Sequence, residues 1–375
     1  MFFRDVTGHE EIKKKLIQTV KENRISHAQL FSGPEGSGNL ALALAYAQFI
    51  SCTDKKEEDS CGICPSCNKY IKYIHPDLHF VFPVNTTEKV KKELPVSDDF
   101  IFMWREMLLE NPYPTLFQWY EKIGIENKQG FISTRESSEI IRKLNLKSFE
   151  SEHKIMIIWM PEKMNLTSAN KLLKILEEPY EKTIFLLITE SPEQIIPTIL
   201  SRTQILKIPG IEEKALFEAL KNRFQMPDKE LQDVARLSEG SYNKAIELIQ
   251  GSEETELNFD RFVKIMRLAY TRDFKGIFEW VEQISSLIRE KQKNFLVYAL
   301  RLIRENWHLN IGNPELVRLS AKEKEFSEKF SAFIHHKNAS RIAEEFNKAC
   351  LHIEANGYAR IVFFDMALKI VKLIR

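Results

Sequence analysis

Four of the five cysteines of this chain lie within residues 52–67, in a spacing that suits a metal ion. They are Cys52, Cys61, Cys64 and Cys67, so two C-x-x-C steps share the third cysteine of the set. Four thiolates complete the tetrahedral coordination of Zn²⁺ and leave no position open for a substrate. A redox pair is disfavoured because the motif holds more than two cysteines, and the simplest alternative is a group of reduced thiols. The spacing therefore predicts a structural zinc site.

A glycine-rich segment, GPEGSG, has the spacing of a phosphate-binding loop but lacks two of the side chains that such a loop uses. A working P-loop reads G-x-x-x-x-G-K-[ST]: its backbone N–H groups surround the phosphates, its lysine contacts the outer phosphates and its hydroxyl binds magnesium. Gly33, Gly36 and Gly38 are in place, but Asn39 and Leu40 occupy the lysine and hydroxyl positions. We therefore expect a degenerate loop without ATP; the alternative is a glycine-rich turn.

A buried strand predicted at residues 154–158 gives a second test of ATP chemistry. In P-loop NTPases an acidic residue at the end of such a strand holds the metal ion. Here Trp159 and Met160 follow the strand, and the first acidic residue is Glu162, beyond a proline. Two separate parts of the ATPase machinery are therefore missing, which predicts a chain that does not hydrolyse ATP by itself.

The hydrophobic patterns place these motifs in an α/β domain with a parallel sheet, because predicted strands and helices alternate along the chain. Strands are expected at 27–32, 78–83, 154–158, 184–189 and 205–208, and helices at 9–24, 39–50, 137–149 and 166–178. Strand, glycine loop and helix follow one another at 27–50, which is the context that a P-loop requires. Beyond Pro209 only helical periodicity remains, so the rest of the chain is predicted to be all-α.

The length of 375 residues is more than one hydrophobic core usually serves. We expect a P-loop domain at 1–209, which carries the zinc module at 52–67 and an insertion of unknown role at 84–130. A small helical domain at 210–252 and a larger one at 253–375 follow.

Charge and hydropathy exclude two broad classes. The 54 lysines and arginines against 53 acidic residues give a formal net charge of +1, so the chain has no overall basic character of a DNA-coating protein. No apolar run reaches about 18 residues, and the first residues lack a signal-peptide pattern, so we expect a cytoplasmic protein that does not enter a membrane.

Three segments closely resemble the clamp-loader subunits of bacterial DNA polymerase III, which are AAA+ proteins. They are RxxHAxLFSGPxGxG, which ends at Gly38 and is followed by the cysteine cluster, NKLLKILEEP, which ends at Pro179, and TILSR, which ends at Arg202. The resemblance covers residues 1–83 and 132–250. Loss of the ATPase residues resembles the family's delta-prime class, not its gamma/tau class, and Asn243 occupies the lid position where active members carry an arginine.

The resemblance implies a P-loop AAA+ domain, a helical lid at 210–252 and a helical collar at 253–375 that closes a hetero-pentameric ring. It implies gamma/tau and delta subunits as partners, in a complex that loads the sliding clamp onto primed DNA within the DNA polymerase III holoenzyme. It also implies a role for Arg202, because in the family this arginine enters the ATP site of the neighbouring subunit and stabilises transition-state charge. The alternative is an arginine that caps or salt-bridges a turn.

Two other functions stay open at this point. One is a divergent but active ATPase of the gamma/tau type, in which another lysine, such as Lys163 or Lys171, replaces the missing one. The other is a zinc-knuckle DNA-binding protein, against which the near-neutral composition argues.

Overall fold

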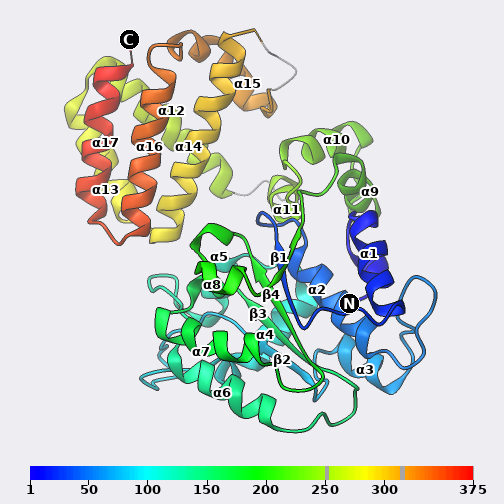
Figure 1. The fold of residues 1–375 in the computed structure, drawn as a ribbon. Coiled ribbons are helices and arrows are strands. Elements are labelled where there is room, and N and C mark those ends of the chain that lie inside the picture. The colour runs from blue at the N-terminus through cyan, green and yellow to red at the C-terminus, as the bar shows by residue number, and fades with distance from the viewer. Residues whose placement is uncertain (250–252, 313–316, 375) are drawn as a thin grey trace. The chain divides into compact units, whose positions relative to one another are not determined.

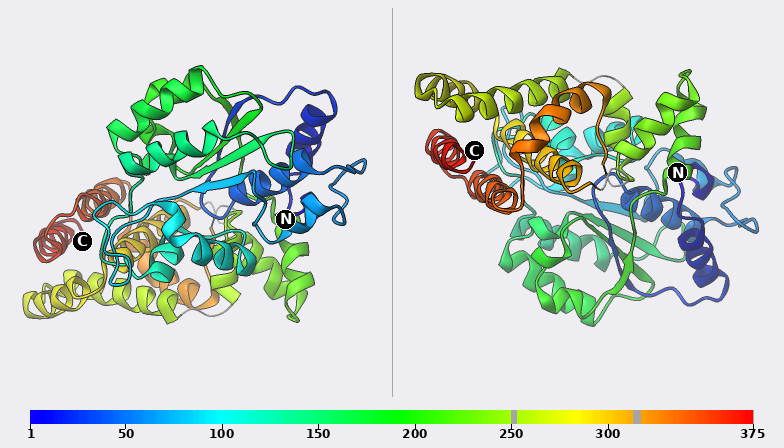
Figure 2. Two further views of the ribbon diagram at one scale, coloured as in Figure 1. Left: turned by 90° about the horizontal axis from the view of Figure 1, so that it is seen from below. Right: turned by 90° about the horizontal axis from the view of Figure 1, so that it is seen from above.

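The structure is a computed structural model that describes residues 1–249, 253–312 and 317–374 (Figures 1 and 2). The chain divides into two compact units, Met1–Ala245 and Ile246–Arg375. The helices at 210–245 fall in the first unit, and their assignment to a separate lid domain stays a prediction. Within the described residues, no helix is long and apolar enough to cross a membrane.

The first unit is built on a sheet of five parallel strands in the order β2-β3-β4-β1-β5. The strands are β1 Ala28–Ser32, β2 Leu78–Val81, β3 Lys154–Trp159, β4 Thr183–Thr189 and β5 Gln204–Lys207. Every residue of β3 and β4 is buried, because helices cover both faces of the sheet. The predicted parallel α/β architecture is therefore confirmed, although the strand expected at 78–83 ends at Val81.

The remaining elements of the first unit connect these strands or cover the sheet. They are η1 Phe3–Asp5, α1 Glu10–Lys21, α2 Asn39–Ser51, α3 Pro65–Ile71, η2 Ser97–Phe100, α4 Ile101–Glu110, α5 Leu116–Ile123, α6 Thr134–Asn145, η3 Pro161–Lys163, α7 Leu166–Glu177, η4 Pro192–Gln194, α8 Pro197–Leu200, α9 Glu213–Arg223 and α10 Asp228–Leu237, with α11 Tyr242–Ile249 at the boundary between the units. The helix expected at 137–149 begins earlier, because the Ser133 hydroxyl accepts a hydrogen bond from Glu136 N and caps the helix at that point.

Alternate side chains of the strands point to opposite faces of the sheet and meet different helices. Met156, Ile158 and Phe185 lie in one buried cluster with residues of α6, α7 and α8. On the other face, the Phe31 ring lies 6.3 Å from the Tyr46 ring of α2. This helix is buried along all of its residues, which explains its apolar, alanine-rich sequence.

The segment expected as an insertion at 84–130 folds into α4 and α5 and packs against the sheet through its aromatic residues. The Trp104 ring is centred 4.4 Å from Phe82, 5.1 Å from Trp119 and 5.0 Å from Trp159. The Trp119 indole also donates a hydrogen bond to Pro83 O, at 2.8 Å. The segment is therefore part of the first unit's core.

The second unit is all-α in the residues described, as predicted. Its elements are α12 Glu253–Thr271, α13 Phe274–Ser285, α14 Arg289–Asn310, α15 Ala321–Phe330, η6 Ser331–Phe333, α16 Ala339–Glu354 and α17 Ala359–Leu373. Its own core contains fully buried aromatic residues such as Phe262, Trp280 and Phe363.

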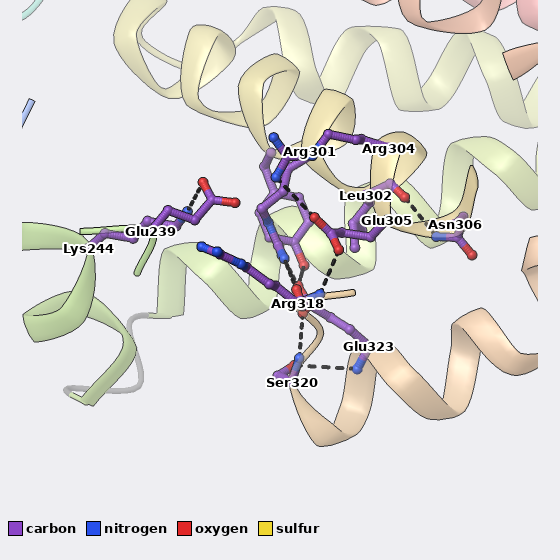
Figure 3. A network of polar contacts seen from close by, with 11 residues as sticks. Glu239, Lys244, Arg301, Leu302, Arg304, Glu305, Asn306, Arg318, Ser320 and Glu323 are labelled. Carbon is purple, nitrogen blue, oxygen red and sulfur yellow. Dashed lines mark hydrogen bonds and ion pairs between the residues drawn. The ribbon is translucent and has the colours of Figure 1, made fainter. Parts of the chain in front are cut away.

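A polar network holds the segment before α15 against α14 (Figure 3). Arg301 donates to Arg318 O at 3.0 Å and pairs with the Glu323 carboxylate. The buried Glu305 accepts a hydrogen bond from Arg318 N at 2.6 Å. Ser320 and Glu323 form a capping box at the start of α15. These charges stabilise the local fold by binding one another.

Candidate functional site

The glycine loop follows β1 and leads into α2, so the sequence places it where a P-loop would lie. Gly36 and Gly38 have positive φ values of 74° and 88°, which favour glycine at both positions. Gly33 N donates to Thr189 O at 3.2 Å, and this bond fixes the loop to the end of β4. The backbone therefore has the strand–loop–helix arrangement that the three glycines predicted.

The residue at the lysine position binds the loop itself. The Asn39 amide nitrogen lies 3.3 Å from Gly33 O and 3.4 Å from Thr189 O, and the Asn39 side-chain oxygen accepts a hydrogen bond from Leu40 N. Asn39 is 6 % exposed. A lysine in a working P-loop reaches outward to phosphate, whereas this amide supports the loop from within.

An aromatic side chain from the 84–130 segment lies directly against the loop. A Cβ atom added to Gly38 would come within 2.9 Å of the Tyr113 ring. Tyr113 stacks on Tyr242, with ring centroids 4.6 Å apart, and its hydroxyl accepts a hydrogen bond from Thr7 N. Burial raises the pKa of Tyr113, so the ring is held here as a neutral phenol. The chain's own side chain thus fills space beside the start of α2.

Amide side chains and backbone hydrogen bonds also connect the glycine loop and Tyr113 to the helices at 210–245. Asn243 donates to Tyr113 O, and Asn111 donates to the Asn243 side-chain oxygen at 3.2 Å. Tyr242 N donates to Gly36 O at 2.9 Å, and a Cβ at Gly36 would overlap the Ser241 hydroxyl. Asn243, at the position where the resemblance implies an arginine in active members, is therefore an amide that contacts the segment packed over the loop.

His9 makes a further contact with the loop, because its Nε2 atom lies 2.7 Å from Ser37 O. Burial lowers the pKa of His9, which favours the neutral ring. Sequence reasoning identified none of Tyr113, Asn111 and His9. The sequence did show Asn243 in place of an arginine, but Tyr113, which contacts Asn243, lies 130 residues away along the chain.

The end of β3 carries no carboxylate directed at the loop. Trp159 is buried in the aromatic cluster, and Met160 N donates to Ile188 O. Glu162 instead accepts hydrogen bonds from the Thr189 hydroxyl, at 2.9 Å, and from Glu190 N, at 3.3 Å. Burial raises the pKa of the Glu162 carboxyl. This acid is bound to the end of the neighbouring strand.

Arg202 lies at the amino-terminal ends of the parallel strands, whereas the glycine loop lies at their carboxyl-terminal ends. It precedes β5, and the parallel register pairs Gln29 with Gln204, whereas the loop begins after Ser32. From Gln29 to Gly33 the chain advances roughly 13 Å, at about 3.3 Å per residue. The Arg202 side chain binds Glu177 at the amino-terminal end of the strands, so it does not reach the glycine loop of its own chain.

The Arg202 guanidinium is held at its edge by short-range contacts. Its Nε donates to Glu177 Oε1 at 2.6 Å, and its Nη1 donates to Thr198 O and to the Ser201 hydroxyl, at 3.0 and 3.1 Å. The side chain is 35 % exposed and that of Glu177 is 49 % exposed. The arginine therefore makes a salt bridge to the last residue of α7 and binds the turn that precedes it, while its side chain stays partly exposed to solvent. Sequence reasoning missed Glu177 as its partner.

The four clustered cysteines converge on one point, as their spacing predicted. Cys52 caps the end of α2, and Cys64 and Cys67 lie at the start of α3. The sulfur atoms of all four lie within 4.8 Å of one another. A tetrahedral Zn²⁺ with Zn–S bonds of about 2.3 Å separates its sulfurs by about 3.8 Å. The Cys61 and Cys67 sulfurs, 3.9 Å apart, match this separation.

Backbone N–H groups in this cluster point at sulfur atoms, which favours thiolates. Cys61 N donates to the Cys52 sulfur and Cys64 N to the Cys61 sulfur, both at 3.3 Å, and Cys67 N donates to the Cys64 sulfur at 3.4 Å. Such bonds stabilise negative charge on sulfur. The donor set and its geometry fit a structural metal ion such as zinc, and no position is left for a substrate.

The cysteine module also anchors the start of the chain. The Asp59 carboxylate accepts hydrogen bonds from Phe3 N and Arg4 N, both at 3.1 Å. The Met1 amine donates to Gln48, whose amide donates to the Ser60 hydroxyl. Burial lowers the pKa of the Met1 amine to about 6. These bonds hold the first residues of the chain against the cysteine module.

The matching family model and the similar curated proteins are subunits of DNA polymerase III. The family model described as "DNA polymerase III, delta subunit" matches residues 8–212. DNA polymerase III subunit delta' of Bacillus subtilis is 27% identical over 308 residues, which are 81% of this chain and 78% of that protein. The delta' subunit of Escherichia coli is 28% identical over 64% of this chain and 59% of its own length.

Other matches lie in related subunits. DNA polymerase III subunit gamma/tau of Mycobacterium tuberculosis is 26% identical over 54% of this chain and 27% of its own length. Among solved structures, a DNA polymerase III gamma subunit-related protein of Thermotoga maritima covers 97% of this chain and 99% of its own, with a TM-score of 0.42 and 14% identity.

Proposed function

This chain belongs to the DNA polymerase III delta-prime family, and from that membership we propose that it is a non-hydrolysing subunit of the clamp loader. In this role it assembles with gamma/tau and delta subunits in a hetero-pentamer and helps to load the sliding clamp onto primed DNA. Relatives named as delta-prime and as gamma/tau subunits support a place in the DNA polymerase III complex.

The absence of hydrolysis by the chain itself is supported by the contacts around the glycine loop. Asn39 binds the loop backbone, and Tyr113 lies against Gly38 where the loop meets α2. Leu40 supplies no metal ligand, and Glu162 is bound to β4. An ATPase needs the lysine, the magnesium ligand and the strand-end acid together.

A replacement lysine finds little support in the contacts. Lys171 donates to the Ser138 hydroxyl of α6 at 3.3 Å, on the side of the sheet opposite α2. Lys163 lies in η3 beside Glu162 and follows a strand end that offers no metal ligand. The contacts of both lysines therefore favour the non-hydrolysing function.

Arg202 is proposed to act on the ATP of a neighbouring subunit. The observation that carries this proposal is the position of Arg202. It lies at the end of the strands opposite its own glycine loop and is partly exposed to solvent. A planar guanidinium with several donors suits the spread charge of a phosphoryl-transfer transition state. To reach a neighbour's phosphate it must exchange some of its bonds to Glu177.

The cysteine cluster is proposed to hold a zinc ion through Cys52, Cys61, Cys64 and Cys67. When bound, the ion would stabilise residues 52–67 and, through Asp59 and Gln48, the start of the chain.

The test is the DNA- and clamp-stimulated ATPase of the reconstituted complex with wild-type chain or with Arg202→Ala. An arginine finger contributes roughly 10³–10⁵-fold in rate, so we expect the stimulated rate to fall by about 10³ while the complex still assembles. Arg142→Ala is the matched control, because Arg142 is also exposed and ion-paired within its own unit. An unchanged rate with Arg202→Ala would leave a scaffold without a finger.

A further inference from the structure

A groove of about 850 Å³ lies between α12 and α15 in the second unit. The two helices run side by side in the same direction along it. At one end the Lys322 amine lies 3.9 Å from the Asp260 carboxylate, and at the other the Tyr270 ring lies 5.1 Å from the Phe333 ring. The resemblance implies that residues 253–375 form the collar of the ring, but it assigns no role to this groove.

The floor of the groove is apolar and only partly covered. Phe330 is buried and stacks on Phe326 at 4.9 Å between centroids, but Phe326, Val263 and Phe333 remain half-buried. Burying apolar surface stabilises by about 25 cal/mol per Å², so leaving neighbouring aromatic and aliphatic groups open to water is unfavourable. A contiguous open apolar surface bordered by charges is typical of a binding site.

The rim has an excess of positive charge. Four cations line the groove, Lys264, Arg267, Lys322 and Lys329, together with two carboxylates, Asp260 and Glu325. Lys322 is compensated, because its amine lies within 4 Å of Asp260 and of Glu256.

The other three cations lack such compensation. Lys264 donates to the neutral amide of Gln283, at 3.2 Å, and neither Arg267 nor Lys329 has an ion-pair partner in the part of the chain that the structure describes. Beyond the Lys322 end, three positive charges therefore stand against the single carboxylate of Glu325.

We propose that this groove binds an amphipathic helix of a partner protein, with its apolar face on the phenylalanines and acidic residues at its edges. Two adjacent helices with an apolar floor form the type of groove into which a third helix packs through residues spaced i, i+3, i+4 and i+7. The uncompensated lysines and arginine select acidic flanks, because like charges on the partner would be repelled. The proposal is independent of ATP and of Arg202.

The experiment uses the full chain and a fluorescein-labelled synthetic helix of about 18 residues, with leucines at that spacing and glutamates beside them. A second probe carries lysines in place of the glutamates. We expect the glutamate probe to bind about 10-fold or more tightly than the lysine probe in fluorescence anisotropy, and its affinity to fall as salt is added. Equal affinities, or a preference for the lysine probe, would overturn the proposal.

Two sets of variants locate the binding. Val263→Glu places a carboxylate on the floor, and Arg267→Glu with Lys329→Glu reverses the rim. Each is expected to weaken binding of the glutamate probe about 10-fold. Lys324→Glu is the matched control, because Lys324 is exposed on α15 but does not line the groove, and it should leave the affinity unchanged.

The rim variants keep the test decisive if Val263→Glu fails to fold, since both of their side chains are exposed. Unchanged affinity in folded rim variants would overturn the proposal. So would sedimentation that shows wild-type self-association abolished by the rim variants while neither probe binds, because the occupant would then be a second copy of this chain.

Discussion

The glycine loop and the cysteine cluster are both ligand-binding motifs, but their polar groups are used in opposite ways. In the cysteine cluster, four sulfur atoms converge within 4.8 Å of one another, and three backbone N–H groups reinforce them. At the loop, by contrast, Asn39 binds Gly33 O and Tyr242 N binds Gly36 O. The cysteine cluster directs four sulfur ligands at a common centre, whereas the polar groups of the glycine loop bind other parts of the same chain.

The difference shows how a retained site is distinguished from a degenerate one. Loss of the P-loop lysine is a sequence fact, but a loop that had only lost its lysine would still be open to anions. Here an aromatic residue and two amides, Tyr113, Asn111 and Asn243, have become part of the packing around it. The loop is therefore part of the packing of the first unit, and the predictions below test this contrast.

The largest effect is expected from Cys61→Ser, which removes one of the four sulfur ligands. Structural zinc binds with an apparent free energy of roughly 10 kcal/mol or more, and that energy is coupled to folding of the site. We expect the variant to lose stoichiometric zinc and residues 52–67 to lose protection in hydrogen exchange. Metal content and exchange mass spectrometry measure both.

The control for this variant is Cys350→Ser, at a buried cysteine of the second unit that is not in the cluster. It should keep its zinc. If neither wild type nor Cys61→Ser holds metal, the four cysteines are reduced thiols and the contrast with the loop fails; if both hold one equivalent, Cys61 is not a required ligand.

Tyr113→Ala should destabilise the first unit by about 3–5 kcal/mol, the range for truncating a buried aromatic side chain. The variant loses the stack on Tyr242 and the acceptor for Thr7 N. Tyr113→Phe keeps the ring and should cost only about 1 kcal/mol for the lost hydrogen bond. Urea unfolding followed by tryptophan fluorescence compares them. A loss below about 1 kcal/mol in Tyr113→Ala would mean that the ring is not a structural part of the loop.

Glu136 holds the start of the segment that carries Tyr113, because its carboxylate accepts hydrogen bonds from Ser97 N and from the Ser97 hydroxyl. Burial raises its pKa from 4.5 to about 7. The proton bound in the folded state therefore adds stability that is complete below about pH 4.5 and is lost as pH rises through about 7.

Glu136→Gln removes this titration while keeping the acceptor for Ser97. At pH 8 the variant should be more stable than wild type by about 2–3 kcal/mol, and at pH 5 nearly equal to it. Unfolding free energies at the two pH values measure the difference. Equal curves at both would show that Glu136 is ionised in the folded protein without cost.

The smallest effect is expected from Asn39→Lys, which restores the P-loop lysine alone. Because Tyr113 still packs beside the loop and Leu40 still offers no metal ligand, we expect no saturable binding of a fluorescent ATP analogue. Asn39→Lys combined with Tyr113→Gly opens the same position and serves as the comparison. Binding by the single variant would show that Tyr113 does not close the loop.

Much of the first unit followed from local sequence patterns. Continuous apolar runs predicted β3 and β4, because strands of a parallel sheet are buried on both faces. Helix ends were less accurate, as at α6, where the cap at Ser133 sets the start. Burial of charged residues did not follow from local patterns either: Lys13 of α1 is buried and donates to Val6 O and to Glu10. The helical spacing of apolar residues does not reveal which groups a buried lysine binds.

By itself the sequence determined the motifs whose chemistry depends on residue type and short spacing. These are the four cysteines, the three glycines without a lysine, and the TILSR segment that ends at Arg202. The tertiary structure decided what surrounds them: Tyr113 against the loop, Glu177 on Arg202, and the partly open groove between α12 and α15. Each of these contacts joins residues far apart in the chain, and local patterns carry no information about which distant side chain fills a given space.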